Sequence, residues 1–137
     1  MKNTISFSKL KQYADDSQVY TAFNSDSFLA CQTQLNQDLN CIYVYAENHN
    51  LKLNASKSCI LFLSSNKNKI EYATNNFLVH INNIQIPVVS EAKNLGMIFD
   101  SNLTFGSHIS KKLSVAYMRL KGLYKLKRHI SSQIKYF

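Results

Sequence analysis

The middle of the chain has the hydrophobic pattern of one long helix. Apolar and aromatic residues recur there at intervals of three and four positions, namely Phe28, Cys31, Leu35, Leu39, Ile42 and Tyr45. This spacing places them on one face of a helix of about five turns. The polar run 48–50 (Asn-His-Asn) predicts the end of that helix.

A second stripe with helical spacing lies near the C-terminus. Its members are Ile109, Leu113, Ala116, Leu120 and Leu123. The pattern predicts an amphipathic helix from about residue 107, with the stripe packed into the core and the basic residues mostly off it. Residues 131–137 predict the start of one more helix.

Before the first helix, the pattern favours strands. The runs 5–10 and 17–23 are rich in Val, Tyr, Thr and Phe, which favour extended structure. Asp15 and Asp16 lie between the two runs, and paired aspartates favour a turn. The sequence therefore predicts a β-hairpin with both carboxylates at its tip.

After the first helix the pattern becomes mixed. Residues 51–63 predict an extended element interrupted near 54–56, and the apolar run 59–63 predicts a buried strand. The polar segment 64–76 predicts a loop.

The following segments predict further strands. Residues 77–81 and 84–89 flank Asn82 and Asn83, a pair that tolerates the positive φ of a tight hairpin turn. Residues 95–99 predict another short strand. Together the elements indicate an α+β chain.

Composition narrows the class of protein. The chain has 137 residues, 45% of them hydrophobic, with one proline and three glycines, which suits one domain with its own core. No apolar run approaches the roughly 18–20 residues that span a bilayer. Cys31, Cys41 and Cys59 form no C-x-x-C pair, and we interpret them as buried free thiols in a reducing compartment. We expect an intracellular protein, in the nucleus or cytoplasm, without a membrane partner.

Charge is distributed very unevenly. Residues 1–100 contain eight basic and eight acidic side chains, whereas residues 101–137 contain eight basic side chains and no carboxylate. Such a block favours a polyanionic partner, with nucleic acid first and an anionic membrane surface second. A solvated helix face that only keeps the protein soluble is the alternative.

One motif carries chemistry. The sequence has no G-x-G-x-x-G, P-loop, H-E-x-x-H or G-x-S-x-G pattern. It does have Tyr13-Ala14-Asp15-Asp16, in which two adjacent carboxylates repel each other unless a cation neutralises them. Such oxygen ligands suit Mg²⁺ or Mn²⁺, and paired divalent ions drive phosphoryl transfer. Two solvated turn aspartates would give the same pattern.

The motif is part of a longer resemblance. The chain resembles the C-terminal part of a reverse transcriptase, an RNA-directed DNA polymerase, and most closely those of non-LTR, jockey-like retrotransposons. The segments that carry the resemblance follow one another in the family's order: 13–20, 35–39, 50–58, 93–100, and 103–105 with 108–109. One departure is Tyr45, where the family usually has tryptophan.

The resemblance implies a fold. It is α+β: the second half of a polymerase palm (catalytic β-hairpin, helix and further strands) in residues 1–90, a primer-grip hairpin in 91–104, and the start of a helical thumb in 105–137. The family's fingers and the earlier palm strand with another metal-binding aspartate would precede Met1. We therefore expect a piece of a polymerase that does not extend a primer by itself.

The resemblance also implies roles around the metal ions. Asp15 would be a direct ligand of Mg²⁺ or Mn²⁺ in a complete polymerase, and Asp16 a weaker or outer one. Tyr13 would support the hairpin from the nucleic-acid side. Lys57 would be the general acid that protonates the leaving pyrophosphate, although an ordinary strand-edge lysine is an equal alternative.

Further roles concern the nucleic acid. Leu95, Gly96 and Met97 would form the primer grip, and a thumb-like helix would place basic side chains on phosphates: Lys111, Lys112 and Arg119. The implied partners are an RNA template, a DNA primer and dNTP. The main alternative is a non-catalytic, basic nucleic-acid-binding remnant, and a basic amphipathic helix on anionic membranes is a weaker third.

Overall fold

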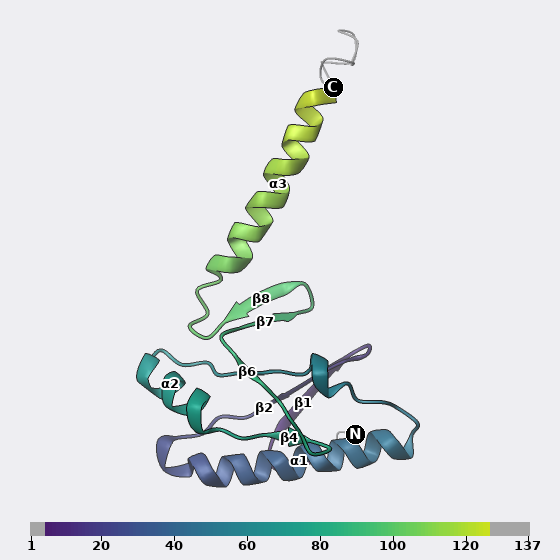
Figure 1. Cartoon of the computed structure of the whole chain (residues 1–137), viewed down its shortest axis with the longest axis vertical. Coiled ribbons are helices and arrows are strands. Elements are labelled where there is room, and N and C mark those ends of the chain that lie inside the picture. Colours follow the sequence, from purple (N-terminus) through teal and green to yellow (C-terminus); the bar gives the residue numbers. More distant parts are fainter. Residues whose placement is uncertain (1–4, 127–137) are drawn as a thin grey trace.

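The computed structural model describes residues 5–126, which form an α+β chain. Helix α1 (Phe28–Asn48) lies along one side of a body that also contains α2 (Lys67–Asn76) and the strands. Helix α3 (Gly106–Leu126) projects away from this body (Figure 1). Within the described residues, no helix combines the length and the apolar character needed to cross a membrane.

The strands are short and pair only two by two in the described part of the chain. Three pairs are antiparallel hairpins: β1 (Lys9–Tyr13) with β2 (Asp16–Tyr20), β4 (His80–Ile81) with β5 (Ile84–Gln85), and β7 (Glu91–Asn94) with β8 (Met97–Asp100). The fourth pair is parallel and joins β3 (Ile60–Leu61) to β6 (Val88–Val89). Two short 3-10 turns, η1 (Ser25–Ser27) and η2 (Ala55–Lys57), complete the body.

The hairpin turns use left-handed backbone. Asn82 and Asn83 have φ of 48° and 61°, which confirms the predicted turn between β4 and β5. Leu95 and Gly96 take φ of 46° and 83° between β7 and β8. Ala14, at φ 52°, opens the turn between β1 and β2. Positive φ at both central residues, as in the last two hairpins, or at the first one, as at Ala14, matches the twist of paired strands, so these turns close tight hairpins.

Aromatic rings from four segments form the centre of the core. Phe77 stacks on Phe23 at a centroid distance of 5.8 Å and meets Phe28 and Phe62 edge-on, both at 5.2 Å. Only 3% of the Phe77 surface is exposed. Phe28 and Cys31 of the predicted α1 stripe are buried in this core, so that prediction is confirmed.

A buried carboxylate ties the N-terminal segment to α1. Asp38 accepts hydrogen bonds from the backbone N–H groups of Ser6, Phe7 and Ser8 and from the Ser8 hydroxyl, at 2.6–3.2 Å. Burial by itself raises the pKa of the Asp38 carboxyl, but the Ser8 hydroxyl and the three N–H donors outweigh it and lower the pKa. Residues 5–8 are therefore held as an irregular segment, and the predicted strand begins only at Lys9.

The segment 64–76, predicted as a loop, contains helix α2. The Asn66 side chain caps this helix by accepting from the backbone N–H groups of Asn68 and Lys69 at 3.0 and 3.4 Å. Ala73 is buried on the side that faces the aromatic core. Tyr72 of α2 also meets Phe28 edge-on at 5.2 Å, but most residues of the helix are polar, which is why the segment was predicted as a loop.

The prediction of three buried thiols is confirmed for Cys31 and wrong for the other two cysteines. Cys31 is buried, and burial raises the pKa of its thiol, but Cys41 and Cys59 are exposed. Cys41 lies on α1 outside the apolar stripe, and Cys59 precedes the short strand β3. The run 59–63 is accordingly a two-residue strand that is half-buried and not a buried strand over its full length.

The C-terminal part differs from the prediction in two ways. The strand expected at 95–99 begins at Met97, because Leu95 and Gly96 form the turn before it. Helix α3 forms as predicted, but its apolar stripe is exposed along its whole length and does not join the core. The helix expected at 131–137 lies outside the described residues.

Candidate nucleic-acid interface

The tip of the β1–β2 hairpin exposes the two predicted metal ligands. Ala14 and Asp15 form the two-residue turn, and Asp16 begins β2 opposite Tyr13. Asp15 and Asp16 are exposed, and 67% of the Tyr13 surface is accessible. The local sequence explains this geometry, since the polar Asp-Asp pair lies where both strands end and solvent hydrates both carboxylates.

One face of this hairpin is turned toward the β7–β8 hairpin. Side chains alternate along a strand, so Asp16 and Gln18 share a face of β2. The Gln18 Nε2 donates a hydrogen bond of 2.9 Å to the Asn94 Oδ1 at the end of β7. Two residues of strand span about 7 Å, so Asp16 lies close to the point where the two hairpins meet.

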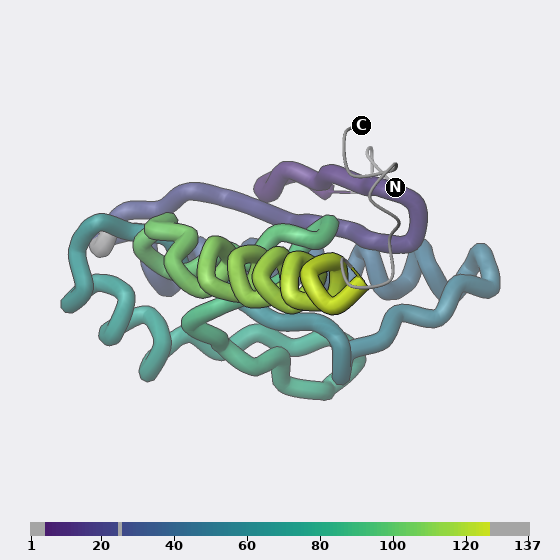
Figure 2. Tube along the Cα trace, turned by 90° about the horizontal axis from the view of Figure 1, so that it is seen from above, coloured from purple at the N-terminus to yellow at the C-terminus, as the bar shows by residue number. Residues whose placement is uncertain are grey.

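The β7–β8 hairpin presents the predicted primer-grip residues beside that contact. Met97 pairs with Asn94 across the hairpin, so both side chains lie on the same face. Leu95 and Gly96 form the exposed turn. The turns of the two hairpins point in the same direction in both views (Figures 1 and 2). The fold thus brings the predicted metal-binding tip and the predicted primer grip to one side.

The first turn of α3 is attached to the same hairpin. The Ile98 N–H donates to the His108 Nδ1 at 3.3 Å, and the Ser107 hydroxyl donates to the Glu91 carboxylate. Phe99 of β8 packs against Phe105 with centroids 5.6 Å apart. These contacts set the direction in which α3 leaves the body.

Asp100 organises the segment between β8 and α3. Its carboxylate accepts hydrogen bonds from the N–H groups of Asn102, Thr104 and Phe105 at 2.6–3.1 Å and from the Thr104 hydroxyl at 3.2 Å. The hydrogen bond from the Thr104 N–H is the largest of the causes that lower the Asp100 pKa, and they outweigh the opposing effect of burial. This carboxylate therefore holds the loop that leads from β8 into α3.

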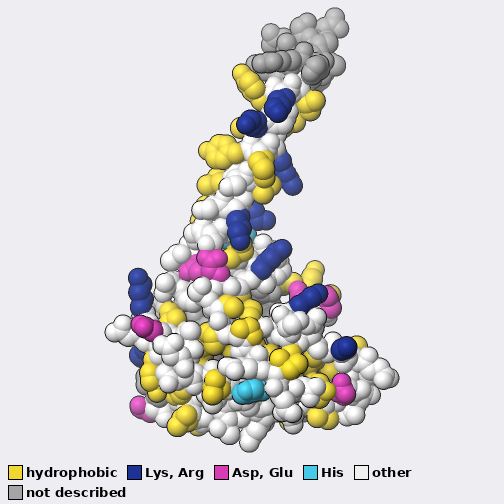
Figure 3. Space-filling view, viewed as in Figure 1, with side chains coloured by type: hydrophobic (Ala, Val, Ile, Leu, Met, Phe, Trp, Pro, Cys, Tyr) yellow, Lys and Arg dark blue, Asp and Glu magenta, His cyan; other side chains and the backbone are white. Residues whose placement is uncertain are grey.

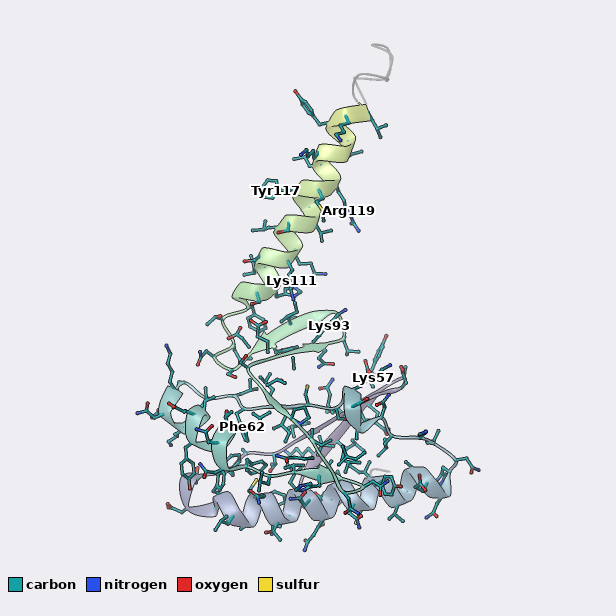
Figure 4. All side chains as sticks on the ribbon, viewed as in Figure 1. Lys57, Phe62, Lys93, Lys111, Tyr117 and Arg119 are labelled. Atoms are coloured by element: carbon teal, nitrogen blue, oxygen red, sulfur yellow. The ribbon has the colours of Figure 1, made fainter. Side chains whose placement is uncertain are left out.

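Basic side chains form a line from α3 down to the body. Figure 3 shows dark-blue side chains along α3 and on the body next to it, and Figure 4 labels Lys111 and Arg119 on α3, Lys93 on β7 and Lys57 on η2. We name these four residues the basic line. Tyr117 points to the opposite side of α3 from Arg119 (Figure 4). Basic and apolar side chains are both exposed along α3.

Lys57 and Lys112 are predicted site residues that lie outside the two hairpins. Lys57 is the last residue of η2 and is exposed. In Figure 1 η2 overlaps the β1–β2 hairpin, but Figure 2 separates the two, so the fold does not set Lys57 beside Asp15. Lys112 follows Lys111 on α3 and is exposed.

The donors available for a metal ion are few. In residues 5–126 no group of three or more His, Cys, Asp or Glu side chains has a metal-binding arrangement. Asp15 and Asp16 are the adjacent carboxylates at the hairpin tip, and Mg²⁺ is commonly held by one or two carboxylates with water and substrate phosphates. The donor chemistry therefore fits a Mg²⁺ that phosphate oxygens also coordinate.

A cavity elsewhere in the body has a different character. It has a volume of about 810 Å³ and lies between β2, β3, α1 and α2, where Phe23, Phe62 and Phe77 line it. Its lining is mainly apolar, and neither aspartate of the hairpin tip contributes to it. We therefore locate the candidate site at the two hairpins and α3.

Three residues of the interface were not identified from the sequence. Lys93 is one of eight scattered basic residues before residue 101, and only its position on β7 brings it into the basic line. Gln18 and Asn94 are 76 positions apart, so no local pattern could pair them.

The comparisons with known proteins give no assignment, because no family model, no curated protein and no solved structure matches the chain.

Proposed function

We propose that this chain is the C-terminal palm and thumb part of a reverse-transcriptase-like polymerase and that it binds nucleic acid through α3 and the two hairpins. In the complete enzyme the reaction is RNA-directed DNA synthesis by two-metal nucleotidyl transfer. The resemblance of the sequence motifs, in their order along the chain, is the origin of this proposal.

One structural observation carries the proposal. The tip with Asp15 and Asp16 and the turn with Leu95 and Gly96 point to one side of the molecule, and Lys93 of the basic line lies on β7 beside Asn94, where the two hairpins meet. A polyanion that follows the basic line from α3 reaches the hairpins. Lysine and arginine contacts to phosphates position a nucleic acid without reading its sequence.

The two aspartates have a defined part in this proposal. Asp15 and Asp16 would hold Mg²⁺, which stabilises the charge on the transferred phosphoryl group and orients the attacking hydroxyl when it is bound. Because both carboxylates are exposed at a tight turn, they keep their ligand atoms directed outward and stay hydrated until a phosphate arrives. Lys57 remains the proposed general acid. Either η2 or the bound substrate would have to shift for Lys57 to reach the leaving pyrophosphate.

The salt dependence of duplex DNA binding tests the proposal. If about three to five side chains contact phosphates, log K should fall against log salt with a slope of roughly −3 to −5. Replacing Lys111, Lys112 and Arg119 together by glutamine should flatten that slope by about two to three and weaken binding to all sequences alike. Fluorescence anisotropy at several salt concentrations measures both quantities.

The control must remove the same charge elsewhere. Lys52, Lys67 and Lys69 lie on the loop after α1 and on α2, outside the basic line, and their triple glutamine variant has the same net charge. This control should keep the parent slope. Equal slopes for the two triple variants, or no binding at low salt, would contradict the proposal and favour a helix face that is only solvated.

Metal binding at the tip can be tested on the same chain. Mn²⁺ is paramagnetic and broadens NMR signals near its site, so Mn²⁺ should selectively broaden the amide signals of residues 13–17. Asp15→Asn combined with Asp16→Asn should abolish this broadening, and Asp26→Asn should leave it unchanged because Asp26 lies in η1. Broadening that persists in the double variant would assign the metal to another place.

A further inference from the structure

We propose that the apolar cavity between β2, β3, α1 and α2 binds an aliphatic carboxylate, with its chain among the aromatic rings and its head group at Lys69. The cavity is lined by residues 19–23 and 60–64 and by parts of the two helices, and we name it the acyl cavity. Neither aspartate of the hairpin tip and no described residue of α3 lines it, so this binding site goes beyond the proposed function and does not depend on it.

The acyl cavity has the size and the depth of a small-molecule site. Its volume of about 810 Å³ lies within the roughly 300–1,000 Å³ of typical ligand pockets. The mouth is formed by side chains that are 46–59% exposed, namely Tyr20, Leu63 and Tyr72. At the deep end, Phe28 and Phe77 are only 6% and 3% exposed. A ligand can therefore enter from solvent and place its apolar part among buried rings.

Polar side chains of the acyl cavity gather around the start of α2. Ser64, Asn68 and Lys69 line the cavity there, and the Asn66 cap fixes the backbone of this first turn through the N–H groups of Asn68 and Lys69. Among the described residues that line the cavity, Lys69 is the only charged one. The head group of a ligand that reaches this end is therefore an anion, because a partly desolvated charge is favourable only beside an opposite one.

The aromatic part of the lining fits an aliphatic chain. Phe23, Phe62 and Phe77 meet one another at centroid distances of 5.2–6.1 Å, and Phe62 is labelled in Figure 4. Phenyl rings offer no conventional hydrogen-bond partner, so a polar group placed among them would lose its hydration without compensation. An anionic head and an apolar tail together describe an aliphatic carboxylate. Burial of its methylene groups supplies the affinity, whereas Lys69 selects the charge of the head group.

Ligands that share one tail and differ in the head group test this assignment. The full chain is titrated by NMR with decanoate, decanol and decyltrimethylammonium, each below its micelle-forming concentration. Decanoate should bind about two- to fivefold more tightly than the other two, the range expected for an ion pair that stays partly in water. Octanoate, which has two methylene groups fewer, should bind about tenfold more weakly than decanoate. The amide signals that shift should be those of residues 60–64 and 68–70.

Two pairs of matched variants locate the ligand. Lys69→Gln should remove the preference for decanoate over decanol, whereas Lys67→Gln should keep it, because Lys67 lies on the same helix but does not line the cavity. Ala22→Phe adds a ring to the lining and should weaken decanoate binding about tenfold. Ala30→Phe, on α1 and outside the lining, should leave it unchanged. Both alanines are exposed, so neither ring has to enter the packed core.

Several outcomes would overturn the inference. If decanoate and decanol bind equally, the cavity takes up apolar chains without selecting an anion. If Ala22→Phe and Ala30→Phe bind decanoate alike, or if only the signals of α3 shift, the ligand lies outside the acyl cavity. No binding of decanoate by the parent would exclude the site altogether. The dispersion of the amide signals shows that each variant is folded, and Lys69→Gln changes only an exposed side chain.

Discussion

Helices α1 and α3 have the same length and a similar hydrophobic pattern, but the protein uses them differently. Both have 21 residues. The stripe of α1 is covered by the strands and α2 and holds the aromatic core, whereas the large apolar side chains of α3 stay exposed. The body is also formally neutral through residue 100, whereas the charged side chains after that point are all basic.

This comparison teaches what a helical pattern does and does not determine. Periodicity fixes which side chains share a face, because the helix has a constant number of residues per turn. Whether that face is covered depends on elements elsewhere in the chain. Helix α3 is attached to the β7–β8 hairpin at its first turn, through Ser107 and His108, so its stability depends on those contacts and on the intrinsic preference of its residues.

The largest expected difference between the body and α3 is in the free energy of unfolding, after one large-to-small substitution in each region. Phe77→Ala should lower the free energy of unfolding by about 3–5 kcal/mol, because Phe77 contacts three other rings and is 3% exposed. Leu123→Ala on α3 should change it by less than about 0.5 kcal/mol, since Leu123 is 64% exposed. Urea denaturation followed by near-UV circular dichroism measures both. Equal losses would mean that α3 has a packed partner.

The next effect concerns the buried carboxylate of the body. Asp38→Ala should destabilise the body by about 2–3 kcal/mol, because it leaves N–H donors of residues 6–8 without their acceptor. The folded pKa of Asp38 is lowered, so its contribution is complete above the unfolded pKa of about 3.9 and is lost as the pH falls through the folded value.

Urea midpoints between pH 7 and pH 2 measure this acid dependence. Asp38→Asn should be less stable than the parent at pH 7, and the difference between the two should shrink below about pH 4. Asp26→Asn, in η1, is the control and should follow the parent. A difference between parent and Asp38→Asn that is constant with pH would contradict the assigned role.

Replacing a glycine by alanine should change local stability in opposite directions in the β7–β8 hairpin and in α3. Gly96 has φ of 83°, so Gly96→Ala should destabilise the β7–β8 hairpin by about 1–2 kcal/mol. Gly122 lies within α3, with open space where an alanine methyl group would lie, so Gly122→Ala should stabilise that helix by about 0.5–1 kcal/mol. Amide hydrogen exchange in β7–β8 and in α3 measures each change locally. The same sign in both places would contradict this description of the two regions.

The smallest effect lies at the junction between body and helix. Asp100→Asn should speed amide hydrogen exchange at Asn102, Thr104 and Phe105, because a neutral amide accepts these N–H groups more weakly than a carboxylate. The core around Phe77 should keep its protection. Unchanged exchange at all three amides would show that Asp100 does not hold the junction.

Local patterns predicted the elements whose stability is local. The spacing of Phe28, Cys31 and Leu35 predicted α1, and Asn82-Asn83 predicted a tight turn, because left-handed backbone is accessible to asparagine. The hairpin tip with Asp15 and Asp16 was predicted because paired aspartates favour a turn, although the positive φ falls on Ala14. Each of these signals lies within a few residues of the structure it determines.

Local sequence patterns did not predict the parts of the structure that depend on contacts between residues far apart in the chain. Helix α2 is mostly polar and is held by its Asn66 cap and by Ala73 and Tyr72 against rings from other segments. Asp38 receives donors from about thirty residues earlier in the chain, which nothing around it indicates. The sequence likewise predicted both hairpins of the candidate site but not the hydrogen bond between Gln18 and Asn94, because that depends on how the two pack.

The turn between β7 and β8 has an evolutionary consequence. Leu95 has φ of 46°, a backbone conformation that asparagine adopts with less strain, as the Asn82-Asn83 turn of this same chain illustrates. Selection for stability alone would therefore favour asparagine at position 95, whereas this chain has a leucine there whose side chain is 52% exposed.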